Sequence, residues 1–189
     1  MANTLRFRCE CGTVTGTVER ATPDQGDHVV CHCVNCQAFA RRFDAAERVL
    51  DAQDGTALYQ SRCARVRIDS GRDRLACLHL TEKPTLRWYA ACCDTPMFNT
   101  YANGKIPYVT TLLGNCEESG VAALGPPLGH LFLDDTQAET AGLKPLSMGR
   151  LMRRFLGRMI KDIFSGDRRR SAFFDGKTLK PIATPQRLS

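Results

Sequence analysis

Alternation of apolar and polar positions over the first hundred residues predicts a mainly β body. Residues 13–19 alternate and are rich in β-branched side chains, which is typical of a strand. Residues 64–69 and 75–81 alternate in the same way around a Ser-Gly-Arg-Asp turn, so they predict a hairpin. Residues 85–89, Thr-Leu-Arg-Trp-Tyr, predict a further strand that leads to a pair of adjacent cysteines.

The body shows helical spacing at one place. Phe39, Phe43 and Leu50 recur at helical intervals and predict a helix from about residue 37 to residue 50. Residues 114–127, which include a Gly-Pro-Pro run, predict a loop.

A longer amphipathic helix is predicted at about residues 148–164, with Ser147 as N-cap and Gly166 as its stop. Its apolar face is wider than half the helix, which is broader than a surface helix needs. We expect it to pack on its own domain with a solvated basic rim; the alternatives are an anionic membrane surface or a partner's groove. The apolar positions are Met148, Leu151, Met152, Phe155, Leu156, Met159, Ile160, Ile163 and Phe164, and the basic positions are Arg150, Arg153, Arg154, Arg158 and Lys161.

Charge divides the 189-residue chain into an acidic body and a basic tail. The net charge is +6, yet residues 1–143 carry 14 basic and 17 acidic groups, whereas residues 144–189 carry 12 basic and 3 acidic groups. The run at 168–170 is Arg-Arg-Arg without interleaved aromatics, so nucleic-acid binding is not favoured. We predict a zinc-binding β domain at 1–115, a loop-rich connection at 116–143 and a basic C-terminal extension at 144–189.

Ten cysteines, all at or before Cys116, call for a chemical explanation. They make up about 5% of the chain, below the roughly 8–10% of disulfide scaffolds. The N-terminus has no signal-peptide pattern, and no stretch approaches the roughly 18 apolar residues of a membrane span. We therefore expect a cytoplasmic protein whose clustered, reduced thiols indicate metal binding.

The cysteines fall into groups with metal-ligand spacing. Zn²⁺ takes thiolates tetrahedrally at about 2.3 Å; four protein ligands close a structural site, whereas three leave a position for water or substrate. The middle group supplies three sulfurs within six residues, and the first pair needs partners, for which the last pair is the obvious candidate. The groups are Cys9 and Cys11; Cys31, Cys33 and Cys36; and Cys92 and Cys93.

The remaining metal-binding residue types carry weaker signals. Cys63, Cys77 and Cys116 stand alone, which favours buried or incidental thiols. His32 lies between two of the proposed ligands, but the neighbouring sulfurs already crowd that site. The other three histidines have no partner at ligand spacing.

The order of these motifs resembles the glutathione-dependent formaldehyde-activating (GFA) family, which includes the centromere protein V group, over about residues 5–102. The shared features are Cys-x-Cys-Gly at 9–12, Cys-His-Cys-x-x-Cys at 31–36, Gly-x-x-x-Tyr-x-Ser at 55–61 and Cys-x-Thr-Pro at 93–96. The resemblance implies a tent-like fold of antiparallel sheets with zinc knuckles, pinned by a structural zinc and carrying a second zinc in a cleft. The C-terminal amphipathic helix lies outside it.

Applied to the matching positions of this chain, the resemblance implies that Cys31, Cys33 and Cys36 are ligands of a catalytic zinc. It makes Cys9, Cys11 and Cys93 structural ligands. The family has Cys-x-x-Cys-Gly at the third group, where this chain has Ala90, an extra Cys92, and Asp94 for the glycine. Either Cys92 supplies the missing sulfur or the structural site is altered or empty, so one or two zinc ions are expected. Gln37 and Ala38 also stand where the family often has Arg-Lys, which concerns the substrate more than the metal.

Two functions follow from this pattern. The first is a zinc-dependent carbon–sulfur lyase that handles an adduct of a small thiol, such as glutathione, with an aldehyde such as formaldehyde. Arg41, Arg42 and Arg87 are candidate partners for glutathione's carboxylates. The second is a non-catalytic zinc module whose basic tail binds a protein or a membrane surface, with a body that stays folded without the tail. The oligomeric state is not predicted.

Overall fold

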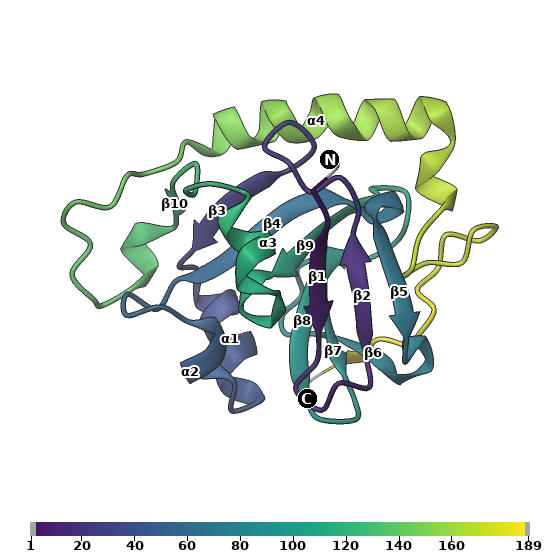
Figure 1. Cartoon of the computed structure of the whole chain (residues 1–189), viewed down its shortest axis with the longest axis horizontal. Coiled ribbons are helices and arrows are strands. Elements are labelled where there is room, and N and C mark those ends of the chain that lie inside the picture. The colour runs from purple at the N-terminus through teal and green to yellow at the C-terminus, as the bar shows by residue number, and fades with distance from the viewer. Residues whose placement is uncertain (1–2, 188–189) are drawn as a thin grey trace.

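A computed structural model describes residues 3–187 and shows a mainly β protein with a long C-terminal helix (Figure 1). The smaller sheet has the order β1 (Leu5–Arg8), β2 (Thr15–Val18), β5 (Val66–Ser70). The larger sheet has the order β10 (His130–Leu131), β3 (Asp27–Cys31), β4 (Thr56–Arg62), β9 (Tyr108–Leu112), β8 (Thr95–Tyr101), β7 (Thr85–Ala90), β6 (Leu75–His79), β11 (Gln186–Arg187).

The helices lie outside these sheets. The α-helices are α1 (Val34–Arg42), α2 (Ala46–Val49), α3 (Glu118–Ala122) and α4 (Met148–Ser165). Short 3₁₀ turns are η1 (Cys63–Arg65), η2 (Arg72–Arg74), η3 (Leu113–Asn115), η4 (Leu133–Asp135) and η5 (Asp167–Arg169). In Figure 1, α4 runs along the top edge, whereas α1 and α2 lie together at the lower left.

Strand pairing is antiparallel inside both sheets, as expected, and parallel only where β10 meets β3 and β11 meets β6. Both parallel strands come from residues beyond 129 and add to the edges of a sheet built by residues 27–112. The larger sheet is therefore mixed.

The strands predicted at 13–19 and 85–89 are confirmed, but the predicted hairpin of residues 64–69 and 75–81 is wrong. β5 pairs with β2 in the smaller sheet, and β6 pairs with β7 in the larger one. The intervening Gly71 has φ +68, and the turn η2 that follows takes the chain from one sheet to the other. Two strands that are consecutive in the chain and both alternate in polarity therefore need not pair with each other.

The helix predicted for residues 37–50 is two helices, since α1 begins at Val34 and Asp44 interrupts the path with φ +50. The loop predicted for 114–127 contains η3 and α3. The predicted tail helix is confirmed as α4, with Ser147 at its N-cap position and Gly166 in the left-handed C-cap conformation.

Two apolar cores lie on opposite faces of the larger sheet. One core joins it to the smaller sheet and contains Phe7, Trp88 and Phe98. The other joins it to α1 and α2 and contains Phe39 and Cys36. Because side chains alternate along a strand, residues 86 and 88 of β7 enter the first core while residues 87 and 89 face α1.

The basic tail takes part in this packing. The Phe173 ring centroid lies 5.3 Å from that of Trp88 and 5.0 Å from that of Phe98, and Phe173 and Phe174 are buried in the first core. Phe173 and Phe174 of the predicted extension thus contribute to the core of the body, while the division of the chain at 116 and 144 stays a prediction.

Buried ion pairs fix α4 to the strands beneath it. Asp162 is buried and accepts a hydrogen bond from Arg62 of β4 at 2.6 Å. Asp27 of β3 is fully buried and binds Arg154, at 2.5 Å, and Arg158 of the helix. No helix among residues 3–187 combines the length and the apolar character needed to cross a bilayer.

Candidate metal centres

Four sulfur atoms meet where the turn after β1 lies against the loop between β7 and β8. All four Sγ atoms of Cys9, Cys11, Cys92 and Cys93 lie within 4.8 Å of one another. Individual Sγ–Sγ distances are 3.6 Å for Cys9–Cys11, 3.9 Å for Cys9–Cys92 and 3.3 Å for Cys11–Cys92. Sulfurs held about 2.3 Å from one tetrahedral zinc lie about 3.8 Å apart. The group therefore fits a tetrahedral zinc.

The shape of the β7–β8 loop lets adjacent cysteines reach one site. Ala90 pairs with Thr95, so only residues 91–94 make the turn. Asp94 has φ +53, a left-handed conformation that Asp adopts more readily than most residues. Ala90 is itself fully buried in the core. The structure thus brings Cys92, rather than residue 90, into the four-sulfur group.

Hydrogen bonds join the turn after β1 to the β7–β8 loop and give the sulfurs different pKa values. The Val14 amide donates to Cys9 Sγ at 3.2 Å, and the Glu10 amide donates to Thr95 Oγ1 at 3.1 Å. Hydrogen bonding to Thr13 lowers the pKa of Cys11 to about 6, whereas burial raises the pKa of Cys9. One thiolate forms readily here, and a bound cation would have to displace the other protons.

The second group lies where β3 ends and α1 begins. Cys31 is the last residue of β3, Cys33 is the N-cap of α1, and Cys36 lies in its first turn. Their three Sγ atoms lie within 4.8 Å of one another; Cys31 and Cys36 are each 6% exposed, and Cys33 is half-buried. A helix N-terminus favours the thiolate form. Among residues 3–187 no fourth Cys, His, Asp or Glu joins this group, so it offers three ligands.

These three sulfurs share their protons unequally. The hydrogen bond between Cys31 and Cys33 lowers the pKa of Cys33 and raises the pKa of Cys31. The Cys31 contact lowers the pKa of Cys36, but the Cys33 contact and burial outweigh it and leave that pKa raised. These directions favour the thiolate form at Cys33 and the thiol form at Cys31 and Cys36.

Arg87 places a buried positive charge beside this group. Its Nη1 donates to Cys36 Sγ at 3.6 Å and to Asn99 Oδ1 at 2.9 Å, and its guanidinium carbon lies 5.6 Å from the centre of the Phe39 ring. Asn99 Nδ2 in turn donates to Thr110 Oγ1 at 2.8 Å, so a chain of hydrogen bonds crosses three strands. Burial opposes the charge, but Cys36 and Cys33 outweigh it and raise the pKa of Arg87.

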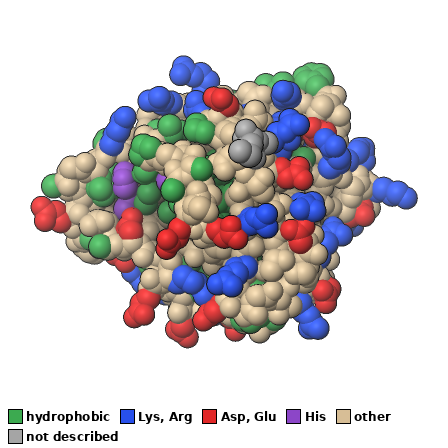
Figure 2. All heavy atoms as spheres, in the orientation of Figure 1, with side chains coloured by type: hydrophobic (Ala, Val, Ile, Leu, Met, Phe, Trp, Pro, Cys, Tyr) green, Lys and Arg blue, Asp and Glu red, His purple; other side chains and the backbone are tan. Residues whose placement is uncertain are grey.

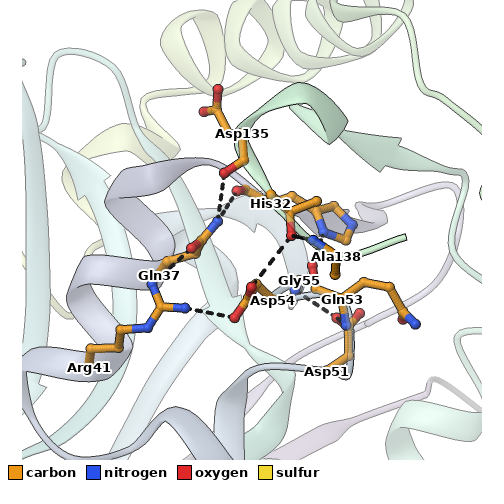
Figure 3. Close-up of polar contacts among 10 residues, drawn as sticks. His32, Gln37, Arg41, Asp51, Gln53, Asp54, Gly55, Asp135 and Ala138 are labelled. Atoms are coloured by element: carbon orange, nitrogen blue, oxygen red, sulfur yellow. Dashed lines mark hydrogen bonds and ion pairs between the residues drawn. The ribbon is translucent and has the colours of Figure 1, made fainter. Parts of the chain in front are cut away.

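A second polar network fixes the backbone between the ligands (Figure 3). Gln37 Nε2 donates to the His32 carbonyl at 2.7 Å and to the Asp135 carbonyl at 3.2 Å, and Gln37 Oε1 accepts from Arg41 at 2.9 Å. Arg41 also binds Asp54 Oδ1 at 2.7 Å. Of the three arginines predicted to bind a substrate carboxylate, Arg41 and Arg87 are therefore both engaged within the protein. An amide suits position 37 because it donates to two carbonyl groups and accepts from a guanidinium at the same time.

His32 turns away from the sulfurs and contacts a histidine that the sequence did not connect with it. Its Nδ1 lies 2.9 Å from the Gln53 carbonyl, which can only accept, so Nδ1 carries the proton. His32 Nε2 lies 3.0 Å from His130 Nδ1, so a hydrogen bond joins the two rings. Burial and His32 lower the pKa of His130. The pairing depends on β10 aligning with β3, a long-range contact without local signal.

The remaining cysteines stay apart from both groups. Cys63 and Cys77 are fully buried and Cys116 is half-buried, which agrees with the prediction that they are buried or incidental. A hollow of about 710 Å³ beside β1 and β2 is lined by Cys9 and Cys116 and by none of the three sulfurs at α1.

Comparisons with known proteins give a family but no activity. The family described as "Family of unknown function (DUF6151)" matches residues 1–184, and no curated protein matches the chain. A crystal structure of a Rhodobacter sphaeroides protein is similar with 17% identity and a TM-score of 0.43, covering 65% of this chain and 96% of that one. These comparisons do not show the GFA family. The match over residues 1–184 means that the chain belongs to the DUF6151 family.

Proposed function

We propose that the protein binds two zinc ions, a structural ion at the four-sulfur group and a reactive ion at Cys31, Cys33 and Cys36. The observation that carries the proposal is the difference in ligand number between the two groups. Four converging sulfurs close a tetrahedral site, whereas three leave one position for an exogenous ligand. Cysteine thiolates favour zinc over magnesium or calcium, which take oxygen ligands.

We further propose that the three-sulfur group serves a carbon–sulfur lyase of the GFA type. Bound there, zinc would hold a small thiol such as glutathione as its thiolate. In the direction of synthesis, the thiol sulfur attacks the aldehyde carbon, the C–S bond forms as the C=O π pair moves to oxygen, and that oxygen takes a proton from solvent. Lyase turnover is the reverse. Arg87 offsets the negative charge that three ligands and an incoming thiolate bring together.

A non-catalytic zinc module is the second candidate. The observation in its favour is that Gln37 and Arg41 are engaged in fixing the His32 carbonyl and Asp54, which suits a structural knuckle. Under this reading both ions would only stabilise the fold, and the three-sulfur group would not bind a substrate thiol.

Zinc counting tests the metal sites. Elemental analysis of purified protein should give two ions per chain, one in Cys92→Ser, one in Cys33→Ser, and two in the matched control Cys116→Ser, whose sulfur lies outside both groups. An unchanged count in Cys33→Ser would refute the three-sulfur site.

Adduct exchange tests the activity. The rate at which ¹³C-formaldehyde exchanges with its glutathione adduct can be followed by NMR against the spontaneous rate. Acceleration by wild type and by Cys116→Ser, with loss in Cys33→Ser, is the expected result. Two bound ions without acceleration would favour the non-catalytic module.

A further inference from the structure

The exposed side of α4 carries a continuous row of apolar side chains, which we call the α4 stripe. Five members recur every four residues from Met148 to Phe164, and Ile163 lies three residues after Ile160, so they share one side of the helix. Their exposed fractions run from 41% for Ile163 to 87% for Phe164. The stripe consists of Met148, Met152, Leu156, Ile160, Ile163 and Phe164.

The stripe lies beside the side of α4 that packs on the body. Leu151, Met159 and Asp162 are the buried residues of the helix, and Arg154 and Arg158 bind Asp27 beneath it. These contacts hold α4 on the body and leave each stripe side chain at least 41% exposed, so much of the stripe's apolar surface lies in water. Taking about 200 Å² for a large exposed side chain, the stripe presents on the order of 600 Å², at the upper end for a monomer.

Positive charge borders the stripe. With 3.6 residues per turn, the side of the helix next to the stripe carries Arg150, Arg153 and Lys161, and all three are exposed. The single acidic residue of α4, Asp162, is buried against Arg62. Figure 2 shows Lys and Arg side chains along the edge where α4 lies, with hydrophobic side chains among them. The surface that α4 offers is therefore apolar and basic.

We propose that the α4 stripe docks the protein on an anionic membrane surface, with α4 lying parallel to the bilayer. From Met148 to Phe164 the helix extends about 24 Å, and its apolar side chains would enter the headgroup boundary while the bordering arginines and lysine contact lipid phosphates. A bilayer accepts a straight apolar row on a convex helix without a matching groove. A second copy fits less well, because stripe-to-stripe packing would bring basic residues together without carboxylates. This inference is independent of the proposed zinc chemistry.

Vesicle co-sedimentation of the full chain tests the proposal. We expect the protein to sediment with phosphatidylcholine vesicles that contain phosphatidylserine and to stay in solution with phosphatidylcholine alone. Leu156→Glu combined with Ile160→Glu should weaken binding at least about tenfold, because both side chains leave water on docking. Arg153→Gln combined with Lys161→Gln should weaken it roughly 30-fold, since each basic residue contributes about 1 kcal/mol at an anionic surface.

The matched control is Ile182→Glu, which changes an exposed apolar residue outside α4 and should leave vesicle binding unchanged. Thermal melting and zinc content should match wild type in every variant, because the altered side chains are exposed. The proposal is overturned if wild type does not bind anionic vesicles, if it binds neutral ones equally, or if the stripe variant still binds. Stripe-dependent dimerisation in light scattering without vesicle binding would show that a second copy covers the stripe. Retention on polyglutamate without vesicle binding would point to an acidic protein.

Discussion

Replacing Arg87 by methionine should weaken zinc binding at Cys31, Cys33 and Cys36 and leave the four-sulfur group unaffected. The guanidinium donates to Cys36 Sγ at 3.6 Å and is 6% exposed, so its charge acts on the thiolates with little screening by solvent. Methionine keeps much of the stem volume beside Phe39 but removes the charge and the hydrogen bond.

The size of the effect can be bounded from this geometry. A unit charge pair at that distance attracts by about 4–5 kcal/mol at an effective dielectric constant of about 20. Part of this attraction is offset because burying the guanidinium is costly. Loss of a hydrogen-bonded partner of a metal ligand typically lowers metal affinity about 10–100-fold, or about 1.4–2.8 kcal/mol. We expect a loss within that range.

Competitive titration with a chromophoric zinc chelator measures both sites in one experiment. In Arg87→Met one of the two ions should be lost to the chelator earlier, while the other serves as internal reference. Arg87→Lys should recover part of the affinity, because it restores charge without the planar fork. Arg62→Met combined with Asp162→Leu is the matched control, since it removes another buried guanidinium together with its partner and touches neither sulfur group. Wild-type affinity at both sites of Arg87→Met would refute the role assigned to this residue.

Three further predictions concern stability and protonation. Phe173→Ala should lower the free energy of unfolding by about 3–5 kcal/mol in urea melts, because its ring packs between Trp88 and Phe98; an unchanged midpoint would contradict the packing. Asp162→Leu should cost about 3–5 kcal/mol by stranding Arg62, and adding Arg62→Met should recover most of that loss; a double variant no better than the single one would argue against the pair. Zinc affinity at the three-sulfur group should rise with pH from 6 to 8, because Cys31 and Cys36, whose pKa values are raised, must lose protons to bind; calorimetry in buffers of different ionisation enthalpy should detect proton release, and a flat profile would be inconsistent with it.

Local patterns predicted the elements that depend on local rules. The amphipathic period and the Ser147 and Gly166 caps define α4, and cysteine spacing identifies both sulfur groups. What the sequence did not reveal depends on strand register. Arg87 aligns with Asn99 across β7 and β8 and reaches Cys36 only because that face of the sheet meets α1. The wrong hairpin has the same cause, since nothing in residues 64–81 records that β5 joins β2.

The position of Phe173 and Phe174 sets an order for biosynthesis. A ribosome releases the chain from its N-terminus, so the strand bearing Trp88 emerges well before the aromatic pair that covers it. Until residues 173–187 follow, the part of the first core around Trp88 and the β6 edge that β11 later occupies stay open to other chains. A nascent chain that pauses before this segment would expose apolar surface to which a chaperone can bind. Complete burial of Trp88 therefore awaits the aromatic pair of the basic tail.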